Sequence, residues 1–211
     1  MLNIEEFTNF SHINNIVLGG AGFLGSNLVD KLVNSGENVI CIDNLSTGKF
    51  ENIKHLKSCK NFNFIKHDIL FPLSSKIPIE KIWHLASPAS PSIYQENTLK
   101  TIRVIYEGTY NALLLARENV SKFLFASTSE VYGITKNNLQ YESMPITLST
   151  TSPRACYSES KRLAETLIKT FADKYNLDTK IARIFNTYGP RVSLNDGRVI
   201  GNFIKQSLMK E

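Results

Sequence analysis

The sequence lacks the features that mark several large classes of protein. No apolar stretch reaches the roughly 20 residues that a membrane-spanning helix needs, and residues 1–15 are too acidic and polar for a secretory signal peptide. The chain has no block of five or more like charges, no internal repeat and no low-complexity segment. We therefore expect a cytoplasmic globular protein that binds neither membranes nor nucleic acid.

Cysteine is also scarce. Cys41, Cys59 and Cys156 form no CxxC pair and have no histidine at metal-ligand spacing, so we predict neither a disulfide framework nor a metal site. The net charge of +5 is spread along the chain; it can attract a small polyanion, although a mildly basic surface is the more ordinary explanation. The 211 residues are 42% hydrophobic and 20% charged, enough for a sizeable core.

Apolar runs alternate with helical patterns along the chain. We predict strands at residues 16–18, 39–42, 62–65, 82–86, 122–126 and 179–185, helices at 24–33, 94–117, 157–175 and 199–209, and a polar surface loop at 134–151. Parallel neighbours need a crossover, which is usually a helix. The alternation therefore predicts an α/β fold with a Rossmann-type doubly wound parallel sheet, which binds ligands beyond the carboxyl ends of its strands.

A glycine-rich turn separates the first predicted strand from its helix. Gly19, Gly22 and Gly25 leave room for a pyrophosphate, which the amino end of the helix would bind with its free N–H groups. Asp43 ends the second strand, where a carboxylate can accept both ribose hydroxyls and would repel the extra phosphate of NADP. This pattern predicts NAD, against the alternative of a tight turn with a capping aspartate. Asp68 can bond the adenine or stay an exposed loop carboxylate.

A second candidate site lies at the start of the helix predicted for residues 157–175. Tyr157 and Lys161 are four residues apart and share a helix face, so the ammonium can favour a phenolate that acts as a base. An unshifted tyrosine titrates near ~10 and would be a poor base at neutral pH. Thr128, at the end of the fifth strand, would bond the same substrate hydroxyl.

Eight segments carry a resemblance to a known family. They are GGAGFLGS (19–26), DNLSTGK (43–49), HDI (67–69), HLASPASP (84–91), STSEVYG (127–133), PRACYSESKR (153–162), RIFNTYGPR (183–191) and NDGRV (195–199). The chain resembles the extended short-chain dehydrogenase/reductase family of nucleotide-sugar enzymes, most of all the branch that decarboxylates UDP-glucuronate. Members of this family continue past the equivalent of residue 211 into a substrate-binding region.

The resemblance implies a domain plan and an assembly. Residues 1–14 would be an amino-terminal extension, 15–190 an NAD-binding Rossmann domain, and 191–211 the start of a truncated substrate-binding region. The two long helices resemble those that form a four-helix interface in family dimers, which implies a homodimer.

The resemblance also implies a reaction. Tyr157, assisted by Lys161 and Thr128, would remove the C4 hydroxyl proton of UDP-glucuronate while hydride passes to NAD. The resulting 4-keto acid would lose carbon dioxide, take a proton at C5 and receive the hydride back as UDP-xylose. Glu130 would handle the proton near the sugar. Ser129 stands where related dehydratases carry an aspartate that donates a proton. Because serine is a poor acid, the change favours decarboxylation over dehydration.

Further residues match family positions that contact ligands. The implied cofactor contacts are Gly19, Gly22, Phe23, Leu24, Gly25, Asp43, Asn44, Asp68, Ile69, Leu85, Ser87, Thr128, Tyr157 and Lys161. The implied substrate contacts are Ser87, Asn111, Arg117, Arg154, Asn186, Arg191 and Arg198, although each arginine alone could equally lie on the surface or cap a helix. His84 is expected to be structural. The alternatives are another nucleotide-sugar dehydratase or epimerase, or an NAD-binding module without turnover.

Overall fold

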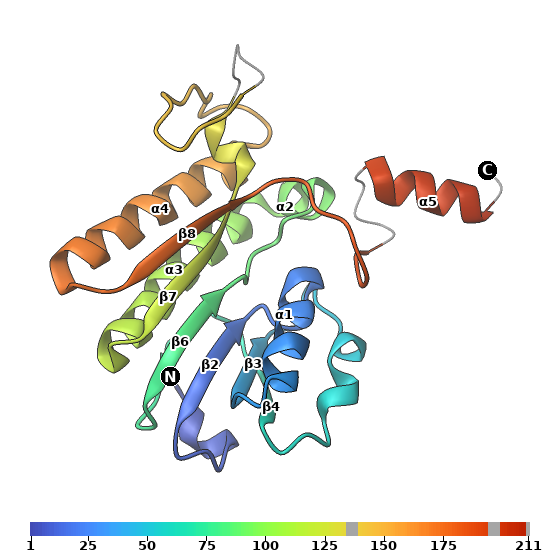
Figure 1. Ribbon diagram of the computed structural model, residues 1–211. Helices are drawn as coiled ribbons and strands as arrows, with labels where there is room; N and C mark the ends of the chain where they lie inside the picture. Colours follow the sequence, from blue (N-terminus) through green and yellow to red (C-terminus); the bar gives the residue numbers. More distant parts are fainter. Residues whose placement is uncertain (134–138, 194–198, 210–211) are drawn as a thin grey trace.

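The computed structural model describes residues 1–133, 139–193 and 199–209, and its centre is a six-stranded parallel sheet (Figure 1). The strands are β2 (Ile13–Leu18), β3 (Val39–Asp43), β4 (Phe62–Lys66), β6 (Ile79–His84), β7 (Lys122–Thr128) and β8 (Thr179–Ile184). Their order across the sheet is β4-β3-β2-β6-β7-β8. This order reverses between β2 and β6, which confirms the predicted Rossmann-type sheet and fixes its switch point.

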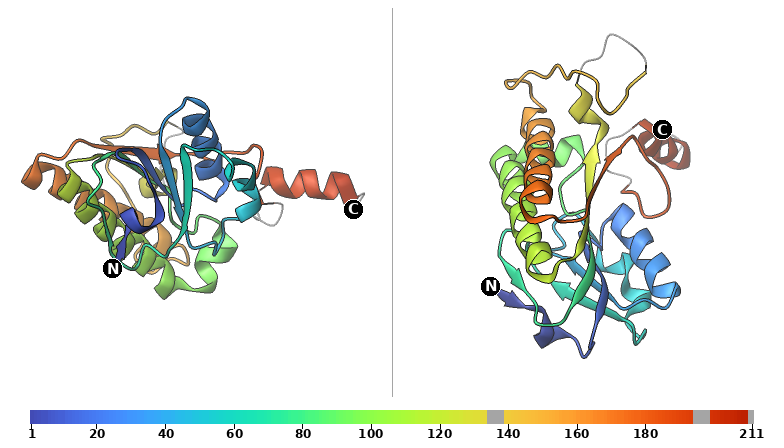
Figure 2. Two further views of the ribbon diagram at one scale, coloured as in Figure 1. Left: turned by 90° about the horizontal axis from the view of Figure 1, so that it is seen from below. Right: turned by 60° about the vertical axis from the view of Figure 1, so that its left-hand side comes forward.

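Helices cover both faces of the sheet. α1 (Phe23–Asn34) packs on β2 and β3, whereas α3 (Thr98–Asn119) and α4 (Ala155–Tyr175) pack on β6, β7 and β8 from the other side (Figures 1 and 2). Alternate residues of β2 therefore enter different cores: Ile16 and Leu18 join the α3 and α4 side, and Val17 joins the α1 side. Strands buried on both faces appear in the sequence as continuous apolar runs.

The helix predicted for residues 94–117 is instead two helices. α2 (Pro91–Glu96) begins at a proline, and α3 follows after Asn97, whose backbone leaves the helical region at φ −133°. The Asn97 side chain accepts a hydrogen bond of 2.9 Å from the backbone N–H of Lys100 and so caps α3. Hydrophobic periodicity continues across this break, which is why the sequence pattern missed it.

The amino-terminal residues are packed against the domain. β1 (Leu2–Asn3) pairs in parallel with the short strand β5 (Leu73–Ser74), and the 3-10 helix η1 (Ile4–Phe7) follows. Ile4 is fully buried in the core beside the sheet. Three further 3-10 helices are η2 (Phe50–Asn52), η3 (Lys54–Leu56) and η4 (Ser129–Tyr132).

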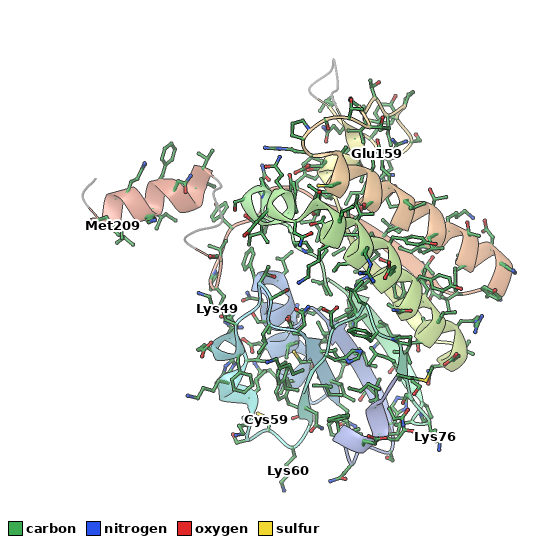
Figure 3. The ribbon with its side chains drawn as sticks, turned by 180° about the vertical axis from the view of Figure 1, so that it is seen from behind. Lys49, Cys59, Lys60, Lys76, Glu159 and Met209 are labelled. Atoms are coloured by element: carbon green, nitrogen blue, oxygen red, sulfur yellow. The ribbon has the colours of Figure 1, made fainter. Side chains whose placement is uncertain are left out.

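The last described helix lies apart from these layers. α5 (Val199–Met209) follows the expected bounds and projects away from the helices that cover the sheet (Figures 2 and 3). The predicted surface loop lies partly outside the described residues; its described part forms no helix and touches Gly133 through a bridge at Thr147. In the described part of the chain, no helix combines the length and apolarity needed to cross a membrane.

Candidate active site

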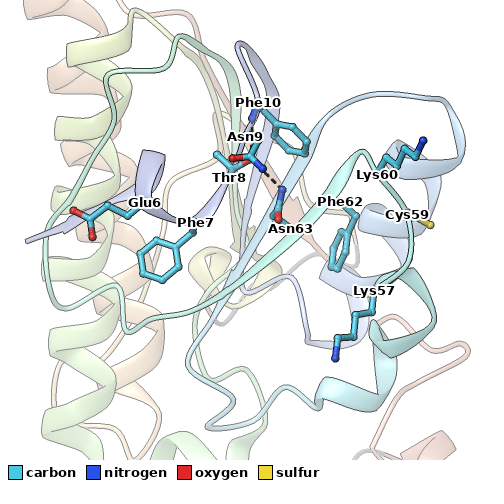
Figure 4. Close-up of a pocket in the computed structure, with 10 residues that line it drawn as sticks. All are labelled: Glu6, Phe7, Thr8, Asn9, Phe10, Lys57, Cys59, Lys60, Phe62 and Asn63. Atoms are coloured by element: carbon cyan, nitrogen blue, oxygen red, sulfur yellow. Dashed lines mark hydrogen bonds between the residues drawn. The ribbon is translucent and has the colours of Figure 1, made fainter.

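A cleft of about 1250 Å³ lies at the carboxyl ends of the strands, where the doubly wound fold places ligands. Its lining includes residues from the glycine turn, the end of β3, the loop after β6, the end of β7 and the start of α4. A smaller hollow of about 580 Å³ lies among Phe7, Phe10, Lys57, Phe62 and Asn63, near the starts of β2 and β4 (Figure 4). That hollow is at the opposite edge of the sheet, so the large cleft is the candidate site.

The glycine turn forms one end of the cleft. Gly19 has a φ of +78°, and a Cβ atom there would lie 2.7 Å from the backbone of Ala86, just beyond β6. A Cβ atom on Gly25 would lie 2.1 Å from the carbonyl oxygen of Gly19. The turn can thus cross the switch point closely and lead directly into α1, whose amino end faces the cleft. This geometry fits a ligand that carries a pyrophosphate.

Asp43 lies beside the turn and is only 8% exposed. Its Oδ2 accepts a 2.9 Å hydrogen bond from the N–H of Ala21, and its Oδ1 accepts a 2.8 Å bond from the N–H of Leu45. Burial raises the pKa of Asp43, and these two backbone bonds partly offset the rise. The carboxylate lines the cleft and keeps lone pairs for a ligand hydroxyl. Through the hydrogen bond from Ala21, Asp43 also stabilises the glycine turn, in addition to the ligand contact predicted for it.

The residues after β3 and β4 support one another. Asn44 donates a 2.9 Å hydrogen bond to Asp68 Oδ2, and Asp68 Oδ1 accepts a 3.0 Å bond from the N–H of Leu70. Asn44 and Ile69 line the cleft, whereas Asp68 is absent from its described lining. Asp68 thus stabilises the turn that holds Asn44 and Ile69 at the cleft.

Lys161 lies deeply buried at the other end of the cleft. Its side chain enters from α4, and Nζ donates a 2.7 Å hydrogen bond to the carbonyl oxygen of Ala126 and lies 4.5 Å from the Phe125 ring centroid. Burial lowers the pKa of Lys161 to about 7, although the charge of Glu165 acts in the opposite direction. The charge of this side chain therefore changes near neutral pH.

Tyr157 and Thr128 lie close to this lysine. Tyr157 is one helical turn earlier on α4, 5% exposed, with its ring centroid 5.8 Å from Lys161 Nζ. Thr128 ends β7, lines the same cleft and accepts a 3.2 Å hydrogen bond from the N–H of Glu130. The fold thus brings Thr128 into the same cleft as Tyr157 and Lys161, which lie on a later element of the chain.

Ser129 and Glu130 follow Thr128 on η4 and also line the cleft. Glu130 is half-buried, and Arg154 Nη1 lies 3.8 Å from its Oε1. Ser129 lies between Thr128 and Glu130 in the chain and offers a hydroxyl to the cleft. A carboxylate, a hydroxyl and a buried amine therefore share one wall.

A second polar cluster supports this wall and was not predicted from the sequence. Glu165 accepts a 2.5 Å hydrogen bond from the Ser127 hydroxyl and pairs with Arg183 Nη2 at 2.7 Å. Arg183 also donates a 3.0 Å bond to the carbonyl oxygen of Glu142. These bonds tie α4 to β7, β8 and the loop over them. The one available signal was the spacing of four residues from Lys161 to Glu165, which places both on one helix face.

Several predicted ligand contacts do reach the cleft. Leu85, Ser87, Arg154, Asn186 and Arg191 line it, as do Phe23 and Leu24 at the start of α1. Arg198 lies outside the described residues.

Asn111 and Arg117 are not in the part of the cleft that the structure describes. Asn111 donates hydrogen bonds of 2.9 and 3.1 Å to the carbonyl oxygens of Ile69 and Leu70. Arg117 is near the end of α3, with its guanidinium 5.3 Å from the Tyr175 ring centroid. At 1.5 Å per residue, this is roughly 20 Å along α3 from Val104, which lines the cleft. The structure does not bring these two residues to the described cleft, and their role as substrate contacts stays a prediction.

Arg191 lines the cleft and also contacts α1. Its Nη2 lies 2.5 Å from Asp30 Oδ2 on α1, and its backbone has a φ of 73°. Asn27, also on α1, donates a 3.2 Å hydrogen bond to the carbonyl oxygen of Pro190. The segment after β8 is thereby held against α1, while Arg191 Nη1 has no hydrogen-bond partner among the described residues.

His84 is buried behind the cleft, as expected for a structural histidine. Its Nε2 lies 3.0 Å from Thr109 Oγ1, and Nδ1 has no hydrogen-bond partner among the described residues. Burial lowers the pKa of His84 to about 3, with a smaller contribution from Lys161, so the ring is neutral at neutral pH.

Comparison with known proteins defines the family. The NAD dependent epimerase/dehydratase family matches residues 15–211. UDP-glucuronic acid decarboxylase 4 from Arabidopsis thaliana is 46% identical over 93% of this chain and 44% of its own length. UDP-glucuronic acid decarboxylase 1 from Xenopus tropicalis is 45% identical over 93% of this chain and 46% of its own length. The chain thus spans less than half the length of these relatives.

Solved structures share the fold. A UDP-N-acetylglucosamine 4-epimerase from Methanobrevibacter ruminantium M1, in complex with UDP-N-acetylmuramic acid, superposes with a TM-score of 0.83 and 31% identity over 96% of this chain and 64% of its own. A dTDP-glucose 4,6-dehydratase from Bacillus anthracis in complex with NAD gives a TM-score of 0.77 and 25% identity over 94% of this chain and 62% of its own. This chain belongs to the NAD dependent epimerase/dehydratase family.

Proposed function

We propose that the chain carries the NAD-binding and reactive part of an enzyme that decarboxylates UDP-glucuronate to UDP-xylose. One observation carries the proposal: Tyr157, Lys161 and Thr128 line the same cleft as the glycine turn. The decarboxylases of Arabidopsis thaliana and Xenopus tropicalis, at 46% and 45% identity, support this choice of reaction.

The glycine turn and Asp43 fit NAD. The narrow passage at Gly19 and Gly25 suits the pyrophosphate, and the buried carboxylate of Asp43 suits the ribose hydroxyls. An additional phosphate on that ribose, as in NADP, would face a carboxylate. When bound, NAD accepts a hydride from the sugar and returns it later in the same cycle.

The side chains at the other end move the protons. The Tyr157 phenolate takes the proton of the sugar C4 hydroxyl, the Lys161 ammonium favours the phenolate, and the Thr128 hydroxyl holds the sugar oxygen. Oxidation at C4 makes the sugar a β-keto acid. Its C5–carboxylate bond then breaks, carbon dioxide leaves, and the bonding electrons form an enolate. Glu130 directs a proton to C5, and Tyr157 returns its proton to the C4 oxygen as that carbon is reduced.

Ser129 favours decarboxylation over dehydration. Dehydration must expel a hydroxyl, which needs a proton donor, and a serine hydroxyl is a poor acid at neutral pH. Oxidation at C4 is also compatible with epimerisation, and a solved 4-epimerase shares 31% identity with the chain. Epimerisation is therefore the second candidate.

The test is to incubate the purified chain with NAD and UDP-glucuronate and to identify the sugar nucleotide by mass spectrometry. We expect a product that has lost carbon dioxide. Tyr157→Phe, the matched control, should give no product and still bind NAD. A product of unchanged mass with inverted C4 would support epimerisation instead. Saturable NAD binding without any product would contradict turnover by this chain.

We also propose that the chain forms a homodimer through α3 and α4. Leu99, Ile102, Tyr106 and Tyr110 form an exposed apolar stripe on α3, and Leu163 is exposed on α4. Sedimentation velocity should show a dimer for the wild type and a monomer for Ile102→Lys. A monomeric wild type would contradict the proposal.

A further inference from the structure

One buried aromatic side chain beside the reactive residues has no part in the chemistry proposed above. Tyr94 on α2 is fully buried, and its ring stacks on the ring of Tyr157. The two centroids are 4.6 Å apart and the planes differ by 3°. Lys161 Nζ also lies near the Tyr157 ring, so Tyr157 is fixed by contacts from α2 and from its own helix.

The hydroxyl of Tyr94 reaches a second reactive residue. It donates a hydrogen bond of 3.5 Å to Glu130 Oε1. Burial and, to a smaller extent, the charge of Glu130 raise the pKa of Tyr94 to about 12, so the phenol stays protonated and remains a donor at neutral pH.

The backbone of Tyr94 is also held in place. Its carbonyl oxygen accepts a 3.0 Å hydrogen bond from the Thr101 hydroxyl, and the Cys156 thiol lies 3.6 Å from the same oxygen. These contacts come from α3 and α4. The backbone at Tyr94 is therefore attached to two other helices.

Other polar groups face Glu130, and they differ from Tyr94 in burial. Arg154 Nη1 lies 3.8 Å away, but its side chain is 59% exposed and solvent weakens the pair. Cys156 and Tyr157 on α4 interact with the same cluster. Among the groups described around Glu130, Tyr94 is the buried hydrogen-bond donor with a fixed orientation.

We propose that Tyr94 is a positioning residue that orients Tyr157 through its ring and Glu130 through its hydroxyl. The inference rests on the proposed function, because it assigns these two residues to proton transfer. With this role for Tyr94, α2 becomes part of the reactive site. The position of the base, Tyr157, is then coupled to the position of Glu130, which acts at C5.

Two variants separate the two contacts. Tyr94→Phe keeps the ring and removes the hydroxyl, whereas Tyr94→Leu removes both. We expect kcat for decarboxylation to fall roughly 2- to 10-fold in Tyr94→Phe, the effect of one hydrogen bond. It should fall roughly 100-fold in Tyr94→Leu, because small misplacements of a reactive group are costly. KM should change little in either.

A measurement without substrate tests the same contacts. In protein labelled with ¹³C-tyrosine and ¹³C-glutamate, the Tyr157 ring resonances should shift from their wild-type positions in Tyr94→Leu. In Tyr94→Phe, which keeps the stacked ring, they should stay close to the wild-type positions. The Glu130 carboxyl resonance should move in both. Tyr110→Phe, whose ring contacts Phe171 instead, is the matched control and should move neither.

The outcomes separate the two proposals. Unchanged Tyr157 and Glu130 resonances in folded Tyr94→Phe and Tyr94→Leu would overturn the positioning role. If Tyr94→Leu does not fold, an unchanged Glu130 resonance in the near-isosteric Tyr94→Phe overturns the coupling. Shifted resonances in a chain that yields no decarboxylated product would refute the proposed function and leave the positioning intact.

Discussion

The two ends of the cleft are built by different means. At the cofactor end, backbone atoms approach so closely that Gly19 and Gly25 have no room for a Cβ atom. At the reactive end, side chains from several elements meet, with Lys161 buried against the carbonyl oxygen of Ala126. The close contact between Gly19 and Gly25 is local in sequence, whereas the reactive end exists only after β7 and α4 have packed together. We expect the two ends to fail in different ways.

The largest effect is expected from Gly25→Ala at the cofactor end. The added Cβ would lie 2.1 Å from the Gly19 carbonyl oxygen, and backbone cannot move aside as a side chain can. We expect the free energy of unfolding to fall by about 1–3 kcal/mol or more, with loss of NAD binding. Urea unfolding and NAD titration measure the two effects.

The matched control for this prediction is Gly201→Ala. A Cβ there would lie 3.9 Å from the Ser193 carbonyl oxygen, within a helix that alanine favours. Stability should stay equal or rise by up to about 1 kcal/mol. Normal NAD binding by Gly25→Ala would show that the close approach is not needed.

The reactive end should make the stability of the chain depend on pH above neutrality. Lys161 has a pKa of about 7 in the folded chain, against about 10.4 for an ordinary lysine. Between these values the unfolded chain binds more protons, so the free energy of unfolding rises with pH, by up to about 1.4 kcal/mol per unit. Lys161→Met should lose this slope.

Urea unfolding at several pH values above neutrality measures the slope. Lys169→Met, an exposed lysine on the same helix, should keep it. Equal slopes for the wild type and Lys161→Met would mean that the buried amine keeps an ordinary pKa.

A smaller effect is expected from Asp43→Asn. The amide has one acceptor oxygen, so it cannot accept from both the Ala21 and Leu45 N–H groups as the carboxylate does. We expect NAD to bind about tenfold more weakly, which isothermal titration would measure. Asp68→Asn is the control and should change affinity less. Equal affinity of the wild type for NAD and NADP would contradict the selectivity assigned to Asp43.

The smallest effect is expected from Asn97→Ala, between α2 and α3. Loss of the cap on the Lys100 N–H should lower the free energy of unfolding by about 1 kcal/mol without changing NAD affinity. Asn119→Ala, near the other end of α3, should change it less. A large loss of NAD affinity in Asn97→Ala would mean that the two ends of the cleft are not separable.

Much of the fold could be predicted because its signals are local. Apolar runs located the strands, and the glycines between 18 and 26 located the first turn and α1. The break at Asn97 was missed because a single capping side chain ended one helix and began another within a continuous hydrophobic pattern. Hydrophobic periodicity indicates which face of a helix is buried, but it does not detect a capping side chain that ends one helix and begins another.

The site divides in the same way. The Tyr157 and Lys161 spacing was visible, since both lie on one helix. The Ser127–Glu165–Arg183 cluster and the stacking of Tyr94 on Tyr157 join residues from different elements, which no spacing reveals. Arg117 shows the converse case: its position matches the family pattern, but in the structure its guanidinium lies near Tyr175 and not in the described lining of the cleft.

The sequence by itself determined the parallel α/β sheet, the close glycine turn and the residue types available for chemistry. Backbone sterics and hydrophobic burial act on neighbours along the chain, so their pattern can be read directly. Only the tertiary structure decided which polar groups are buried together, and therefore that Lys161 titrates near neutrality and that Tyr94 contacts both Tyr157 and Glu130. Desolvation and orientation depend on neighbours brought close by folding, and these are distant in sequence.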